Sequence, residues 1–266
     1  MNTGLSHAPR TRTTEPLIAF RAVHHAFGGR PVLENIDLAV AQSEFVCVVG
    51  PSGCGKTTML RLVAGLLTPS VGDVTYAGKR VTGPAREVAF VFQDYSKALL
   101  PWRTAAGNIS LALEASGLPR ARRADRIHEL LDKVGLAGHA GHYPAQLSGG
   151  MQQRLQIARC LAQEPSVLLM DEPFGALDAM TRQALQDEIQ RIIDTSRTTA
   201  LFVTHDLEEA IYLGDRVVAL YPNPGRVAQV FEVDLPRPRN QLTTRESPAF
   251  LKLRRAIFDF VREGEA

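Results

Sequence analysis

The segment from Gly50 to Thr58 limits what this 266-residue chain can fold into. It reads Gly-Pro-Ser-Gly-Cys-Gly-Lys-Thr-Thr and fits G-x-x-x-x-G-K-[ST], the pattern of a loop that wraps the phosphates of a nucleotide. An apolar run over 44–50 predicts a buried strand before it, and a helical pattern over 57–64 follows. Inward-turned backbone N–H groups and the start of the helix favour negative charge there. We therefore expect a nucleoside triphosphate site; a chance glycine-rich turn would leave this context unexplained.

The loop supplies the first set of candidate ligands. Lys56 is expected to reach the β- and γ-phosphates, and the Thr57 hydroxyl is expected to ligate Mg2+. The whole loop is predicted to contact the nucleotide: Gly50, Pro51, Ser52, Gly53, Cys54, Gly55, Lys56, Thr57 and Thr58.

Polar residues follow three further apolar runs. Gln93 follows 87–92, Asp171 and Glu172 follow 166–170, and His205 follows 199–204. Parallel sheets bind ligands at the carboxyl ends of their strands. We expect Asp171, with Gln93, to hold Mg2+ or its water, and His205 to touch the γ-phosphate; Glu172 should point the opposite way along the strand and polarise a water. A plain strand-end Gln and a structural His are the alternatives.

Two other stretches suggest contacts with a nucleotide. Phe27, upstream of the phosphate loop, could stack on a base or could be a core or turn residue. Ser148 precedes Gly149 and Gly150 at the start of a predicted helix, which is a second anion site by the same physics, or an ordinary Ser-capped helix. Asp178 begins the loop after the acidic pair.

Composition and charge restrict the class of protein. The 30 basic and 28 acidic residues give a net charge of +2, too even to indicate nucleic-acid binding. The widely spaced cysteines predict buried thiols in a reducing compartment rather than disulfides or a zinc site: Cys47, Cys54 and Cys160. No apolar run has the 18 or so residues of a membrane span. Residues 1–16 lack the apolar core of a signal peptide and predict a frayed tail. We expect a cytosolic protein.

The remaining chain predicts an α/β fold with an insertion. Residues 104–163 are rich in Ala, Leu and Arg and show helical periodicity, which indicates a helical subdomain inserted between strands. Asp187, Glu188 and Arg191 predict an exposed helix face. Residues 235–239 form an extended linker, and Ser247-Pro248 predicts the start of a last helix with one apolar face.

These motifs together resemble the nucleotide-binding subunit of ATP-binding cassette (ABC) transporters, over about 17–235. The resemblance implies a RecA-like α/β core, an antiparallel β subdomain and an inserted helical subdomain. It also implies roles for individual residues: Phe27 as the adenine-stacking aromatic, Gln93 as the glutamine loop, Leu147 to Gln152 as the signature, Asp171 as the Mg2+ acid, Glu172 as the general base, Gly175 to Asp178 as the D-loop and His205 as the switch histidine.

A narrower resemblance, to the nitrate/sulfonate/taurine importer group, lies in residues 99–102, 224–226 and 235–239. Two departures from the family pattern, Gln42-Ser43 and Gly175, lie outside the reacting groups. The resemblance implies a tail over 1–16, an ABC ATPase domain over 17–235 with a helical subdomain at about 97–163, and a C-terminal extension over 236–266.

The function implied is that of an ATPase which powers uptake of a small solute, such as a sulfonate or nitrate, through a separate permease. It would sit peripherally on the cytoplasmic face of the inner membrane and meet a solute-binding protein only through the permease. Two copies are expected to close on two ATP molecules, with the Ser148 loop of one over the ATP held by Lys56 of the other. The surface at 99–102 is expected to receive a permease helix, unless Trp102 simply packs the helical subdomain.

Two other classes fit less well. Soluble ABC-type ATPases that act on nucleic acid or ribosomes usually carry tandem cassettes, long insertions or basic arms, whereas this chain has one motif set and near-neutral charge. A P-loop GTPase or small-molecule kinase would leave the Ser148 helix unexplained, and no Asn-Lys-x-Asp guanine signature occurs.

Overall fold

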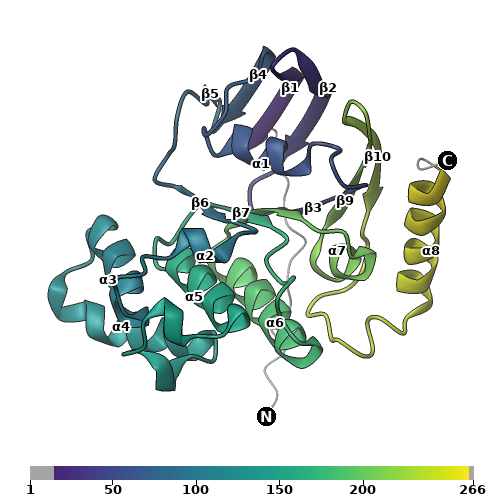
Figure 1. The fold of residues 1–266 in the computed structure, drawn as a ribbon. Coiled ribbons are helices and arrows are strands. Elements are labelled where there is room, and N and C mark those ends of the chain that lie inside the picture. Colours follow the sequence, from purple (N-terminus) through teal and green to yellow (C-terminus); the bar gives the residue numbers. More distant parts are fainter. Residues whose placement is uncertain (1–14, 264–266) are drawn as a thin grey trace.

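The computed structural model describes residues 15–263, which form two sheets with helices between and around them (Figure 1). The predicted N-terminal tail lies outside the described residues except for its last two positions, and so do the last three residues of the predicted extension.

The smaller sheet is antiparallel, in the order β2-β1-β4-β5. Its strands are β1 (Ile18–Phe27), β2 (Arg30–Val40), β4 (Val71–Tyr76) and β5 (Lys79–Arg80). Gly28 and Gly29, with φ of 55° and 83°, join β1 to β2. A two-residue hairpin turn with both φ values positive matches the twist of the paired strands and favours glycine.

The larger sheet has the order β10-β9-β3-β8-β7-β6, and all neighbours are parallel except β10 on β9. Its strands are β3 (Phe45–Val49), β6 (Val88–Val91), β7 (Val167–Asp171), β8 (Thr199–Val203), β9 (Arg216–Tyr221) and β10 (Arg226–Glu232). Every residue of β3, β7 and β8 is buried. Strands covered on both faces have continuous apolar sequences, which explains the runs that identified them.

Alternate side chains of these strands enter two different cores. Val46 and Val48 of β3 pack with α1 (Lys56–Val63) and the smaller sheet, whereas Phe45 and Cys47 pack on the opposite side with the remaining helices. Helix α1 therefore lies between the two sheets (Figure 1). The three cysteines are free and buried, as predicted.

Between β6 and β7 the chain forms a helical region, to the lower left in Figure 1. Its helices are α2 (Tyr95–Ala98), α3 (Ala105–Ala115), α4 (Arg120–Lys133) and α5 (Gly149–Leu161), with 3-10 turns at Ala137–His139 and Pro144–Gln146. Helices α6 (Ala179–Ser196) and α7 (Leu207–Leu213) flank β8 in the chain. Within 15–263, no helix combines the length and apolar character needed to cross a bilayer.

The exposed face predicted for α6 is correct for Arg191 and wrong for Glu188. Glu188 pairs with Arg191 at 2.7 Å, as its spacing indicates, but Glu188 is buried. Asp187 accepts a hydrogen bond from the Tyr212 hydroxyl at 2.7 Å. The contact of Asp187 with Tyr212 of α7 is tertiary, so the spacing of charges along one helix could not reveal it.

The last helix, α8 (Pro248–Glu263), begins where the Ser-Pro pair predicts. The Ser247 hydroxyl accepts a hydrogen bond from the N–H of Phe250 at 3.3 Å, so Ser247 caps the helix. Phe250 and Ile257, on the predicted apolar face, are fully buried in the core on the helical side of the larger sheet.

Candidate nucleotide site

The predicted site residues gather at one edge of the larger sheet. The strands β3, β8, β7 and β6 are neighbours and run parallel, so their carboxyl ends meet there. The phosphate loop follows β3, His205 follows β8, Asp171 and Glu172 end β7, and Gln93 follows β6. The shared polarity of the strands thus places residues more than a hundred positions apart side by side.

The phosphate loop is held closed by its lysine. The Lys56 ammonium donates hydrogen bonds to the carbonyl oxygens of Gly50 at 2.7 Å and Pro51 at 2.8 Å. Its third N–H has only the Cys54 sulfur, at 3.9 Å, which is a weak acceptor that a phosphate oxygen would replace. Gly55 has φ of 91°, and a Cβ there would lie 2.4 Å from Leu33, so the strained turn into α1 admits only glycine.

The candidate metal ligands lie close together. The Thr57 hydroxyl donates to a carboxylate oxygen of Asp171 at 3.1 Å, and Asp171 is buried. Burial raises the pKa of the Asp171 carboxyl, and the Thr57 hydrogen bond opposes this rise. No cluster of three or more His, Cys, Asp or Glu side chains fit for a metal occurs within 15–263. A hydroxyl beside one carboxylate is nevertheless a donor set that fits Mg2+, which keeps waters and substrate phosphates as its other ligands.

Glu172 does not continue the strand, contrary to the predicted alternation with Asp171. Strand β7 ends at Asp171, and Glu172 has φ of 46° in the left-handed region. Its N–H donates to the carbonyl oxygen of Val203, which holds this strained backbone in place. One carboxylate oxygen of Glu172 lies 3.4 Å from the amide nitrogen of Gln93 and 3.2 Å from Nδ1 of His205. The turn brings three of the predicted residues into contact.

Phe27 and Asp178 lie at the borders of this site. Phe27 is the last residue of β1, beside the Gly28-Gly29 turn, and is 47% exposed, with the His25 ring edge-on at 4.7 Å, so it is not part of the core. Asp178 caps α6 by accepting a hydrogen bond from the Thr181 N–H at 3.0 Å, which lowers the pKa of its carboxyl. Stacking of Phe27 on a base stays a prediction.

Ser148 caps α5, because its hydroxyl accepts from the Met151 N–H at 3.3 Å, and its part in a second anion site stays a prediction. This cap leaves the other first-turn N–H groups of α5 without helical partners. A Cβ at Gly149 would come 2.4 Å from the Tyr95 hydroxyl of α2. The glycine therefore lets α2, which follows Gln93, pack against the first turn of α5.

Sequence reasoning missed Gln153. Its side-chain amide donates to the carbonyl oxygen of Glu172 at 3.4 Å and accepts from the Ala176 N–H at 3.2 Å. This buried glutamine ties α5 to the loop that carries Glu172. The available signal was a polar residue four positions before Ile157, on the buried face of the helix.

The apolar run at 99–102 is only partly a surface. Leu99 is buried, whereas Trp102 is 71% exposed, which argues against the alternative that Trp102 packs the helical region. The buried Asn108 side chain holds this loop by accepting from the Leu100 N–H at 2.8 Å and donating to the carbonyls of Leu100, Arg103 and Thr104. The exposed tryptophan is therefore presented on a fixed loop.

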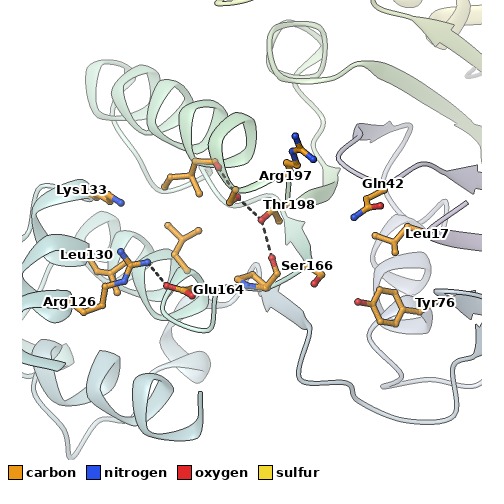
Figure 2. A pocket seen from close by; sticks show the side chains of 14 residues that line it. Leu17, Gln42, Tyr76, Arg126, Leu130, Lys133, Glu164, Ser166, Arg197 and Thr198 are labelled. Atoms are coloured by element: carbon orange, nitrogen blue, oxygen red, sulfur yellow. Dashed lines mark hydrogen bonds and ion pairs between the residues drawn. The ribbon is translucent and has the colours of Figure 1, made fainter. Parts of the chain in front are cut away.

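A cavity of about 690 Å3 lies at the opposite end of the strands (Figure 2). Ser166, which precedes β7, and Thr198, which precedes β8, line it, together with Arg126 and Lys133 of α4. The residues that line this cavity include none of the strand-end set. The cavity and the candidate nucleotide site thus occupy opposite edges of the larger sheet.

The phosphate loop between β3 and α1, with an acid and a base at the neighbouring strand ends, defines a P-loop nucleotide hydrolase. A family model described as ABC transporter matches residues 33–175. The chain is 47% identical over 239 residues to an uncharacterized ABC transporter ATP-binding protein of Methanocaldococcus jannaschii, covering 89% of this chain and 87% of that protein. It is 46% identical over 259 residues to an aliphatic sulfonates import ATP-binding protein of Burkholderia cenocepacia, covering 97% and 92%.

A nitrate import ATP-binding protein of Synechococcus elongatus is 45% identical over 254 residues, which is 92% of this chain and 38% of that protein. Among solved structures, the ATP-binding cassette MJ0796, a dimer in a post-hydrolysis state bound to ADP and Pi, superposes with a TM-score of 0.73 at 31% identity, covering 81% of this chain and 98% of that chain. The chain belongs to the ABC transporter family, as an ATP-binding subunit that hydrolyses ATP.

Proposed function

We propose that this chain is the energy-coupling ATPase of an importer, in which hydrolysis of Mg2+-ATP drives a small anion, such as a sulfonate or nitrate, through a separate permease. The observation that carries the chemistry is the contact of the Glu172 carboxylate with both Gln93 and His205 beside the Thr57–Asp171 pair. The choice of cargo is supported by the sulfonate and nitrate importers among the relatives.

In this proposal each residue has one task. Lys56 neutralises charge on the phosphates, and the phosphate-loop amides orient them. Thr57, Asp171 and Gln93 hold Mg2+, which supplies charge compensation at the phosphate oxygens. Glu172 accepts a proton from the attacking water, and His205 contacts the γ-phosphate. Phe27 stacks on the adenine, and Asp178 belongs to the loop that closes the site.

The unit of this activity is proposed to be residues 17–235, with the helical subdomain at about 97–163 and the C-terminal extension at 236–266. The second anion site, at Ser148, Gly149 and Gly150, completes the nucleotide site of a second copy, so the active form is a homodimer. The subunit acts at the cytoplasmic face of the inner membrane as a peripheral protein. It meets the solute-binding protein only through the permease, and nucleic acid is not a partner.

A reconstituted transporter tests the function. The chain and its permease are placed in lipid vesicles with the solute-binding protein, and ATP hydrolysis is measured with sulfonates, with nitrate and with neither. We expect hydrolysis to need Mg2+ and to rise when one anion is present with its binding protein. Hydrolysis that responds to added nucleic acid and is indifferent to the permease would contradict the proposal.

A further inference from the structure

The C-terminal extension folds back onto α7, the helix that follows His205. In Figure 1 the extension passes below α7 and α8 then rises beside it. The strongest contacts of the extension with α7 are made by arginines. They reach both ends of this seven-residue helix.

At the first turn of α7, two arginines of the extension share one carboxylate. Arg245 donates to Oε2 of Glu208 at 3.0 Å, and Arg254 of α8 donates to Oε1 at 2.7 Å. The Arg254 hydrogen bond is the main cause that lowers the pKa of the Glu208 carboxyl, so Glu208 is ionised at neutral pH. Arg245 also lies over the Tyr212 ring, 5.0 Å from its centroid.

At the last turn of α7, Arg239 binds backbone carbonyls. One of its terminal nitrogens, Nη1, donates to the carbonyl oxygens of Ile211 at 3.2 Å, Tyr212 at 2.8 Å and Gly214 at 2.8 Å. The last carbonyls of a helix have no helical partner, and a cation favours that end of the helix dipole. Arg239 is buried, so this contact fixes the position of the helix end.

Helix α7 fixes the positions of Thr204 and Asp206, the two residues that flank His205 in the chain. Thr204 donates its hydroxyl to the Glu209 carboxylate at 2.8 Å. Asp206 accepts from the N–H groups of Glu208 at 2.9 Å and Glu209 at 3.2 Å. The residues on either side of His205, Thr204 and Asp206, are therefore both hydrogen-bonded to the first turn of α7. His205 and three residues of α8, Arg254, Arg255 and Phe258, line one hollow of about 730 Å3.

We propose that Arg245 and Arg254 are positioning residues for ATP hydrolysis, which hold α7 through Glu208 and so keep His205 against Glu172. The proposal rests on the role proposed for His205. Loss of the two arginines should let the first turn of α7 move. The phosphate loop, where ATP binds, shares no contact with these arginines and should be unaffected.

The test uses the full-length chain and measures kcat and KM for ATP, nucleotide affinity and unfolding temperature. Arg254→Gln combined with Arg245→Gln should lower kcat about tenfold with KM within twofold, short of the hundredfold that a 1 Å misplacement can cost. Glu208→Gln should give the same loss, and adding it to the arginine variants should cause little further loss, since all three act through one contact. Arg254→Lys should recover much of the activity of Arg254→Gln.

Lys252→Gln is the matched control, because Lys252 is exposed on the same helix, and it should behave as wild type. Arg254 is 47% exposed in its side chain, so Arg254→Gln alone serves if the double variant unfolds. A kcat within twofold of wild type in folded arginine variants would overturn the proposal, as would equal losses of kcat and ATP affinity. His205→Ala separates the role proposed for His205 from the role proposed for the arginines. Full activity of His205→Ala would overturn both roles. An inactive His205→Ala variant together with active arginine variants would overturn only the role of the arginines.

Discussion

Helices α1 and α5 both have glycine at their N-terminal ends, Gly55 before α1 and Gly149-Gly150 at the start of α5, and their surroundings differ. The first turn of α1 carries Lys56 and Thr57 and faces the carboxylate of Asp171 at 3.1 Å from the Thr57 hydroxyl. The first turn of α5 is capped by its own Ser148 and packed against Tyr95 of α2. Both ends attract an anion by the same physics. Within the described residues, Lys56, the proposed metal ligands and the proposed base Glu172 lie around the start of α1 and not around the start of α5.

The comparison of α1 with α5 shows that a helix N-terminus does not by itself bring together the side chains that ATP hydrolysis needs. Glu172, the proposed general base, belongs to the α1 side, yet the side-chain amide of Gln153 in α5 donates to its carbonyl oxygen. The α5 end is therefore linked through Gln153 to the loop that carries Glu172, while its first-turn N–H groups other than that of Met151 have no helical partner. This arrangement is what we expect of a surface that completes the site of a second copy.

The largest expected effect concerns the chemistry at the α1 side. Glu172→Gln should keep ATP binding and lower turnover roughly 100- to 10,000-fold, because the amide cannot accept the proton of the attacking water. Steady-state ATP hydrolysis and nucleotide affinity measure the two effects. Turnover within twofold of wild type would remove Glu172 from the role of base and weaken the contrast between the two helix ends.

A smaller effect distinguishes the two helix ends in the monomer. Lys56→Ala should weaken ATP binding about 10- to 150-fold, the range for loss of a hydrogen bond to a charged group. Ser148→Ala should leave the affinity of the monomer for ATP unchanged, because in the proposed dimer the start of α5 contacts the nucleotide held by the other copy.

Titration of monomeric protein with ATP measures both variants, and Lys79→Ala, which removes an exposed charge from β5, is the control. If Ser148→Ala weakened binding to the monomer as much as Lys56→Ala does, both helix ends would serve one nucleotide within one chain.

The smallest effect concerns the loop beside α2, which is expected to contact the permease. Trp102→Ala should leave folding and ATP binding intact and weaken assembly with the permease about tenfold, as expected for an exposed aromatic anchor. Co-purification of the subunit with the permease measures the effect, with Leu66→Ala, a similarly exposed apolar residue elsewhere, as control. Unchanged assembly and transport would exclude Trp102 from the interface.

The strand-end residues were predictable because buried parallel strands have continuous apolar sequences, and their carboxyl ends must share one edge of the sheet. The phosphate-loop motif and the apolar strand sequences thus predict that Lys56, Asp171 and His205 lie close together. The left-handed backbone of Glu172 was not predictable, because a bond from its N–H to Val203, distant in sequence, holds it.

Other features depend on how distant segments dock. Burial of Leu99, and of Glu188 on a face predicted to be exposed, follows from packing that no local pattern encodes. Residues 235–239 predicted only an extended linker, and no role was predicted for Arg245, because the partners of Arg239 and Arg245 are backbone carbonyls and a carboxylate of α7. Such contacts join segments that are distant in sequence, so no local pattern predicts them.

The central claim is that the two helix ends act on the same nucleotide from different copies. Ser148→Arg should block closure of the dimer, and Lys56→Ala should lose nucleotide affinity, so each variant alone should be inactive. In a mixture, each heterodimer has one site with both an intact Lys56 and an intact Ser148. We predict that ATP hydrolysis by the mixture exceeds that of either variant alone. No recovery in a mixture in which heterodimers are demonstrated would contradict the account.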